Sequence, residues 1–168
     1  MSSSDHSSLS DDALMALLAS GDVEALGTLV QRHQRLAWSV ALRFTGDRTA
    51  AEDLVQDTFL TLLEKADGYR PRGLFVAYLL RILTHKAISL KRRKVPEEFQ
   101  ELEHSSPEED TASSLESKAQ KARVQNALAR LPERQRMALI LRFYEDLSGV
   151  EIASIMKTST KSVEHLLA

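Results

Sequence analysis

The sequence predicts an all-α protein of two small helical domains, an N-terminal helix bundle and a C-terminal helix-turn-helix, joined by a flexible acidic linker. Three observations lead to this prediction. Apolar side chains recur at helical spacing through residues 9–94, that spacing disappears over residues 95–117, and residues 118–168 close with two short helices around a tight turn. No segment shows the period-two alternation of a strand. The polar, serine-rich residues 1–8 are expected to be disordered.

The N-terminal domain is expected to begin with two helices. A short amphipathic helix surrounds Leu14, Leu17 and Leu18, and a longer one is capped by Asp22 and ends at Gly46. The apolar stripe of the longer helix consists of Leu26, Val30, His33, Ala37, Val40 and Phe44. This spacing predicts that one face of the helix is buried against its neighbours.

Two further helices complete the predicted bundle. Asp47 is expected to cap the third helix, and the fourth covers residues 74–94 after a loop at 68–73. The apolar stripe of the third helix is Ala51, Leu54, Val55, Thr58, Phe59, Leu62 and Leu63. The apolar face of the fourth is Val76, Leu79, Leu80, Leu83, Ala87 and Leu90. Both stripes predict burial in one shared core.

The total charge of −2 hides a distribution in blocks. Residues 68–94 carry eight basic and no acidic side chains, whereas residues 95–117 carry eight acidic and no basic ones. The acidic block is rich in Glu, Ser and Pro and buries too little apolar surface to offset its ordering entropy, which predicts a flexible linker. Residues 118–168 carry a net charge of +4. Such blocks are usually solvated faces, but each basic one has the electrostatic character of a polyanion-binding surface.

The C-terminal domain is expected to end in a helix-turn-helix. The domain is expected to begin with a helix over 118–131 and a second over 133–144. In the second helix, Ala138, Leu141 and Met137 are expected to face inward. Ser148 and Glu151 form a Ser-x-x-Glu capping box at the start of a short helix, and Ser159 is placed to cap a last one. A short helix, a tight turn and another short helix are the outline of the DNA-binding motif.

Composition excludes several classes of protein. The absence of cysteine excludes disulfides and thiolate metal sites and favours a reducing compartment. The five histidines lack the spacing of a metal site, and neither a signal peptide nor a membrane-spanning run is visible. No nucleophile–base pair, Gly-rich phosphate loop or carboxylate pair indicates an active site. We therefore expect a cytoplasmic protein that is not an enzyme and does not insert into membranes.

Three motifs in order carry a resemblance to a known family. Residues 51–60 read AEDLVQDTFL, residues 69–82 read YRPRGLFVAYLLRI, and LPERQR at 131–136 is followed by LSGVEIA at 147–153. Together, and on either side of an acidic linker, they resemble a bacterial RNA polymerase sigma factor of the extracytoplasmic-function (ECF) group. The resemblance covers both predicted domains.

The resemblance implies a role for each domain. The first, sigma region 2, would dock on the β′ clamp helices of core RNA polymerase and capture the promoter −10 element; the second, region 4, would sit on the β flap and bind the −35 element. The implied core-polymerase contacts are Glu52, Asp53, Gln56 and Asp57. The implied −10 contacts are Tyr69, Arg70, Arg72, Tyr78, Arg81, His85, Ser89 and Arg92. The implied −35 contacts are Ser159, Thr160, Lys161, Ser162, Glu164 and His165.

The chemistry of these side chains is compatible with the implied roles. Acidic and amide groups can pair with arginines of a protein partner, although solvated helix surface is the default for a lone helix. The polar stripe of the fourth helix lies in a block without acidic residues, which favours phosphate contacts over a solvated face. Holding an opened strand needs aromatic platforms near positive charge. Tyr69 and Tyr78 fit that need better than Phe75, which is expected in the core.

The chain departs from the family pattern at four positions. Tyr78 stands where Trp is common, and His85 and Ser89 stand where Asn and Asp are usual, so the family's −10 base preference is not carried over. Lys157 replaces the usual Gly of the turn before the last helix, where a positive φ would be mildly strained. The family's last helix usually continues with a basic stretch beyond the position of Ala168, so we expect a natural tail.

The resemblance also implies partners. Core RNA polymerase and promoter DNA are expected, together with an anti-sigma protein that covers the same faces, and no cofactor is needed because the polymerase supplies the chemistry. One alternative is a stand-alone helix-turn-helix regulator that acts without polymerase. Another is a helical scaffold with no DNA contact. Pull-down with core polymerase and a gel shift on forked promoter DNA separate these three functions.

Overall fold

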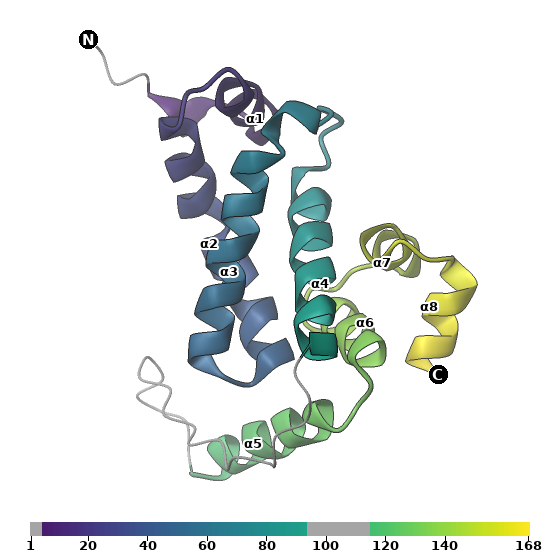
Figure 1. Ribbon diagram of the computed structural model, residues 1–168. Helices are drawn as coiled ribbons and strands as arrows, with labels where there is room; N and C mark the ends of the chain where they lie inside the picture. Colours follow the sequence, from purple (N-terminus) through teal and green to yellow (C-terminus); the bar gives the residue numbers. More distant parts are fainter. Residues whose placement is uncertain (1–4, 94–114) are drawn as a thin grey trace.

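The computed structural model describes residues 5–93 and 115–168, and every regular element within them is a helix. The elements are η1 (His6–Ser8), α1 (Asp11–Ala19), α2 (Glu24–Thr45), α3 (Arg48–Glu64), η2 (Ala66–Gly68), α4 (Phe75–Arg93), α5 (Leu115–Ala129), α6 (Glu133–Phe143), α7 (Gly149–Met156) and α8 (Thr160–Leu167). Figure 1 shows α2, α3 and α4 side by side, with α5 across one end of this bundle and α6, α7 and α8 on the α4 side. The predicted all-α fold, a bundle followed by a helix-turn-helix, is confirmed. Among the described helices, none is long and apolar enough to cross a membrane.

The start of α2 differs slightly from the prediction. Asp22 accepts a hydrogen bond from the Glu24 N–H at 3.1 Å, but the helix begins only after Val23. The buried residues of α2 are Ala25, Leu29, Ala37, Val40, Ala41 and Phe44. The predicted members Leu26, Val30 and His33 are only half-buried. The buried stripe is displaced because α1, α3 and α4 all pack against α2 and select its inward face.

The cap and the core face of α3 follow the prediction. The Asp47 side chain accepts a hydrogen bond from the Thr49 N–H at 3.2 Å, and this satisfies one orphan donor of the first turn. The buried residues of α3 are Ala51, Leu54, Thr58, Phe59, Thr61 and Leu62. Val55 and Leu63 of the predicted stripe are half-buried and pack against this core.

Two apolar residues predicted on the inner face of α4 lie outside it. Val76 is 38% exposed and Leu90 is 40% exposed, whereas Phe75 and Ile88 are buried in their place. The Phe75 ring packs at 5.0 Å from the imidazole of His33, and this contact turns the first residue of the helix inward. The buried face therefore differs from the predicted one by one residue at the start of the helix and by two near its end, while its middle follows the predicted stripe.

The N-terminus is more ordered than predicted. The prediction of disorder over residues 1–8 is wrong for residues 5–8, which form the turn η1 and its cap. Residues 1–4 lie outside the described residues. His6 is buried, with its Nε2 atom 3.1 Å from a carboxylate oxygen of Asp22. Arg32 donates a hydrogen bond to the Ser7 carbonyl at 2.7 Å. The polar composition gave no sign of this order because the contacts reach residues far along the chain.

The predicted linker at 95–117 lies outside the described residues except for its last three positions. Those three form the first turn of α5, which begins at Leu115 rather than at Lys118. Most side chains of α5 are exposed, and Leu128 is the buried one among them. The helix nevertheless contacts α2, where the Gln125 side chain donates a hydrogen bond to the Arg43 carbonyl at 3.0 Å.

The helix-turn-helix forms as predicted. The capping box is complete, because the Glu151 N–H donates to the Ser148 hydroxyl at 3.2 Å and the Ser148 N–H donates to the Glu151 carboxylate at 2.7 Å. Ser159 caps α8 by accepting a hydrogen bond from the Ser162 N–H at 3.1 Å. Between the two helices, Lys157 has a left-handed backbone with φ 50°. The three inward residues predicted for α6 are all buried.

Replacing Lys157 by glycine should stabilise the protein. A left-handed backbone costs an L-residue about 1–2 kcal/mol, and the greater freedom of glycine in the unfolded chain offsets part of that gain. We expect Lys157→Gly to raise the free energy of unfolding by about 0.5 kcal/mol in urea titrations. Lys161→Gly, in the first turn of α8, is the matched control and should lower it by up to about 1 kcal/mol. Destabilisation of similar size in both variants would show that Lys157 carries no strain.

The two domains pack against each other, which the sequence does not predict. Helix α7 lies along α4, and α6 contacts both α2 and α4. Buried residues of both domains belong to one hydrophobic cluster. We call this packing of α4 on α7 the closed arrangement.

Candidate functional site

One exposed face of α3 gathers the four residues predicted to contact core polymerase. They are Glu52, Asp53, Gln56 and Asp57. Two of them already have partners: Arg48 donates to Glu52 at 3.3 Å, and Lys86 of α4 donates to Asp57 at 2.9 Å. Asp53 and Gln56 lie between these pairs on the same face, so they are the side chains best placed to meet another protein.

The next helix, α4, carries the basic surface. Tyr78, Arg81 and Ser89 are half-buried, and His85 is exposed. Burial raises the pKa of the Tyr78 phenol, and nearby Arg81 opposes that rise. Arg92 belongs to α4, but its side chain lies outside the described residues. The predicted polar stripe is therefore continuous as far as Ser89.

The loop from Tyr69 to Gly73, between η2 and α4, presents two arginines to solvent. Arg70 and Arg72 are exposed, whereas Tyr69 is half-buried with its ring edge-on to Tyr78 at 5.0 Å between centroids. The Tyr69 hydroxyl donates to Asp12 of α1 at 2.5 Å. Burial, and then the Asp12 carboxylate, hold the pKa of this phenol well above its ordinary value. Tyr69 is thus packed into the domain rather than presented to solvent.

The N-terminal end of α8 is open to solvent. The exposed predicted −35 contacts are Ser159, Thr160, Lys161, Glu164 and His165. Ser162 is half-buried and its hydroxyl shares a hydrogen bond of 2.9 Å with Ser159. Val163 is buried and fixes the helix against the domain. Recognition helices contact bases with this end, and the structure leaves it available.

A buried arginine missed by the sequence analysis joins the two domains. Arg136 is 3% exposed and donates four hydrogen bonds. The acceptors are the carbonyls of Leu128 at 2.7 Å, Ala129 at 2.7 Å, Leu131 at 3.0 Å and Phe44 at 2.9 Å. Burial lowers the pKa of this guanidinium, and nearby Glu133 opposes that fall. The sequence signal for this role was the position of Arg136 on the inward face of α6, beside Met137 and Ile140. A charged side chain at such a position needs buried hydrogen-bond partners.

A second arginine crosses the domain boundary in the opposite direction. Arg81 of α4 donates from Nε to the Ser154 carbonyl at 3.2 Å and from Nη2 to the Ser154 hydroxyl at 2.9 Å. Ser154 lies in the last turn of α7, and its carbonyl also accepts a hydrogen bond from the Lys157 N–H at 3.4 Å. The C-terminal end of α2 is likewise capped from the other domain, since Phe44 and Arg43 supply the carbonyls bound by Arg136 and Gln125. Each domain therefore donates side-chain hydrogen bonds to the last turn of a helix in the other.

Two sequence families match this chain. The family described as Sigma-70 region 2 matches residues 29–96, and the family described as Sigma-70, region 4 matches residues 121–168. The first match runs from α2 through α4, and the second covers most of α5 and all of α6, α7 and α8.

Named relatives align along nearly the whole chain. RNA polymerase sigma factor NccH of Alcaligenes xylosoxydans xylosoxydans is 32% identical over 169 residues, covering 94% of this chain and 89% of NccH. RNA polymerase sigma factor CnrH of Cupriavidus metallidurans is also 32% identical, covering 92% of this chain and 86% of CnrH. ECF RNA polymerase sigma factor SigW of Bacillus subtilis is 24% identical, with coverages of 86% and 83%.

A solved structure shares the arrangement of the helices. The structure of CnrH in complex with the cytosolic domain of CnrY is similar to this chain with a TM-score of 0.69 at 29% identity. The similarity covers 94% of this chain and 89% of the solved one. It therefore extends over both domains.

Proposed function

This chain belongs to the ECF group of the sigma-70 family and directs promoter recognition by RNA polymerase, and from that premise we propose how its two domains divide the work. Residues 9–94 dock on the β′ clamp helices of core polymerase and capture the −10 element. Residues 118–168 sit on the β flap and bind the −35 element. Sigma factors are initiation factors and not enzymes, so the chain carries recognition while the polymerase carries out the chemistry, in the bacterial cytoplasm.

One observation supports this division most strongly: neighbouring helices of the bundle present opposite chemistry. The exposed face of α3 is acidic and amide-bearing, whereas α4 and the loop before it belong to a block without any acidic residue. The first surface suits arginines of a protein partner and repels DNA. The second suits phosphates. A domain that must hold polymerase and DNA at once needs both surfaces side by side.

The −10 surface has the parts needed to hold an opened strand. Unstacking bases costs a few kcal/mol per step, and single-strand binding recovers this with positive charge and aromatic platforms. Arg70, Arg72 and Arg81 supply charge. Either Tyr69 or Tyr78 supplies the platform, and the engagement of the Tyr69 hydroxyl by Asp12 favours Tyr78.

The −35 surface is the exposed end of α8. Lys161 is its one Lys or Arg, and it lies in the first turn beside Thr160. A lysine here pairs with a phosphate, while hydroxyl and imidazole groups such as those of Thr160 and His165 reach base edges.

The closed arrangement must open on the promoter. The −10 and −35 elements lie about 25 base pairs apart, roughly 85 Å along B-DNA at about 3.4 Å per base pair. In the closed arrangement α4 touches α7, and Arg81 is bonded to Ser154 rather than to phosphate. The chain from Arg93 to Leu115 reaches at most about 75 Å when extended, at roughly 3.4 Å per residue, and the domains themselves cover the remainder. The tether is therefore long enough for both elements to be bound together.

A regulatory protein partner is also proposed. The solved relative CnrH is in complex with the cytosolic domain of CnrY, and its helices are arranged as in this chain. We infer that an anti-sigma protein of this kind binds the present chain over the faces that polymerase and DNA use. The partner would hold the domains together and so keep Arg81 away from the promoter.

Removal of Arg81 should change the salt dependence of promoter binding. Loss of one phosphate contact reduces the slope of log affinity against log salt by roughly 0.7–0.9. Arg35→Ala, an exposed arginine on α2, is the control and should leave the slope unchanged. Tyr78→Ala should instead cost about 1–3 kcal/mol of binding with little change in slope, because stacking releases no counterions. Titrations with holoenzyme in increasing salt measure all three, and equal slopes for Arg81→Ala and Arg35→Ala would remove Arg81 from the phosphate contacts.

Binding assays test the proposed division of roles. The whole chain should co-purify with core polymerase, and the complex should shift forked promoter DNA at salt concentrations where the free chain does not. A stand-alone regulator would shift duplex DNA equally well without polymerase. A scaffold would shift neither DNA.

A further inference from the structure

The loop at 69–73 is tied at its base by a single carboxylate from α1, a helix far away in the sequence that lies at the same end of the bundle (Figure 1). Asp12 of α1 accepts a hydrogen bond from the Tyr69 hydroxyl at 2.5 Å through Oδ1. Its second oxygen, Oδ2, accepts a hydrogen bond from the Gly73 N–H at 2.8 Å. Tyr69 opens the loop and Gly73 closes it, so one side chain joins the two ends.

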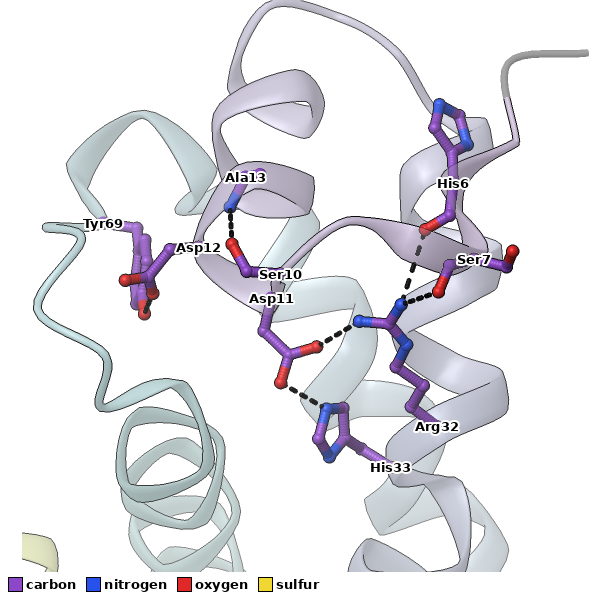
Figure 2. Close-up of polar contacts among 9 residues, drawn as sticks. All are labelled: His6, Ser7, Ser10, Asp11, Asp12, Ala13, Arg32, His33 and Tyr69. Carbon is purple, nitrogen blue, oxygen red and sulfur yellow. Dashed lines mark hydrogen bonds and ion pairs between the residues drawn. The ribbon is translucent and has the colours of Figure 1, made fainter.

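The first turn of α1 explains why the carboxylate points there. Ser10 caps the helix by accepting a hydrogen bond from the Ala13 N–H, which places Asp11 and Asp12 at the first two helical positions. Successive helical residues are about 100° apart, so these carboxylates face different neighbours. Asp11 bonds Arg32 and His33 of α2, each at 2.9 Å, while Asp12 lies against Tyr69 (Figure 2). One acid fixes α1 to the bundle, and the other reaches the loop.

The rest of the loop is arranged around this tie. Gly73 has a left-handed backbone with φ 68°, which turns the chain into α4. The Tyr69 ring is held edge-on by Phe75 and Tyr78, at 6.2 and 5.0 Å between centroids. Arg70 and Arg72 project from between the two fixed ends and are exposed.

We propose that Asp12 is a positioning residue for −10 recognition: it closes the base of loop 69–73 and so presents Arg70 and Arg72 in a fixed arrangement. This inference rests on the proposed −10 role of the loop. A loop ordered before binding loses less conformational entropy when DNA arrives, and its charges meet the strand in one register. Tyr69 then acts as the anchor of the loop, and Tyr78 is left as the stacking platform.

The free protein provides the first test, because it needs no polymerase. Trypsin cleaves after arginine but not before proline, so Arg70–Pro71 is resistant and Arg72–Gly73 reports on the loop. We expect Asp12→Ala to speed cleavage at Arg72–Gly73 about tenfold, since both hydrogen bonds at the base are lost. Asp12→Asn should restore slow cleavage, because its carbonyl can accept from Gly73 and its amide can donate to the Tyr69 oxygen. Mass spectrometry of the fragments identifies the bond that is cut.

Asp11→Ala is the matched control. It removes the same charge from the same helical turn, but its partners are on α2 rather than in the loop. Cleavage at Arg72–Gly73 should remain slow in this variant. If Asp12→Ala is cut no faster than the wild-type chain, or if Asp11→Ala is cut equally fast, Asp12 does not hold the loop and the inference is overturned.

The second test uses holoenzyme on a promoter. Asp12→Ala should slow promoter opening about tenfold, and Asp12→Asn should recover most of the rate. The reactivity of unpaired thymines towards permanganate measures the rate of opening. Affinity for core polymerase should be unchanged in both, which separates positioning from a loss of folding. Faster cleavage with normal promoter opening would overturn the positioning role. If the wild-type chain opened no promoter on core polymerase, the proposed function would fail, and the positioning role, which rests on it, would fail with it.

Discussion

Asp53→Lys is expected to weaken binding of this chain to core RNA polymerase by about 10–100-fold, because an interfacial charge pair becomes a repulsion worth about 1.5–3 kcal/mol. Asp53 is exposed on α3, so stability should change by no more than about 0.5 kcal/mol. Fluorescence anisotropy of the labelled chain, titrated with core polymerase, measures the affinity. Urea unfolding of the same sample measures the stability.

The choice of Asp53 over Asp57 follows from the contacts. Asp57 already pairs with Lys86 at 2.9 Å, so its reversal would also break a link between α3 and α4. Glu24→Lys makes the same change of charge at the exposed start of α2, away from the α3 face, and should bind core polymerase normally. Equal affinities for Asp53→Lys and Glu24→Lys would place the α3 face outside the polymerase interface.

The largest loss of stability is expected from Arg136→Leu. The four carbonyls that this guanidinium serves would lose their donor inside the protein, and a buried acceptor without a partner costs about 1–3 kcal/mol. Some regain water, so we expect a total loss of about 3 kcal/mol, together with a looser contact between α6 and α2 through Phe44. Arg136→Lys should be intermediate, because one ammonium cannot reach all four acceptors in the geometry of the fork.

Arg134→Leu provides the comparison for this effect. Arg134 is half-buried on the same helix, and the variant makes the same change of residue type. We expect Arg134→Leu to lower the free energy of unfolding by less than about 1 kcal/mol. Urea unfolding curves give both values. Similar midpoints for Arg136→Leu and Arg134→Leu would show that the buried hydrogen bonds contribute little to stability.

Local signals predicted most of the helices. The Ser148–Glu151 box, the Asp47 cap and the positive φ of Lys157 are decided within a few residues, and all three are present. The apolar stripes identified the core to within one or two residues. Errors arose where a neighbour selects the face, as at Val76 and Leu90, because periodicity fixes a stripe only to about one or two residues.

Contacts between distant segments could not be predicted. The order of His6 depends on Asp22 and on Arg32 of α2, and the position of Tyr69 depends on Asp12, which lies 57 residues earlier. Neither contact leaves a periodic trace in the sequence. The exposed face of α3 and the basic stripe of α4 were predictable because amphipathic helices separate polar from apolar residues. Their use by polymerase and DNA remains a prediction.

The closed arrangement adds a constraint that the sequence analysis lacked. Arg81 is engaged with Ser154, and the C-terminal end of α2 is capped from the other domain. If the proposed division of roles holds, promoter binding would exchange these hydrogen bonds for phosphate and polymerase contacts. The exchange favours DNA binding by the factor on polymerase over DNA binding by the free factor.

In vitro transcription tests the central claim most directly. Core polymerase alone and core polymerase with this chain are compared on a pool of genomic promoter fragments, and the run-off products are sequenced. We expect transcripts that start at a small set of sites sharing −10 and −35 sequences, only when the chain is present, and fewer of them with Asp53→Lys than with Glu24→Lys. An identical set of products with and without the chain would contradict its assignment as a promoter-specificity factor.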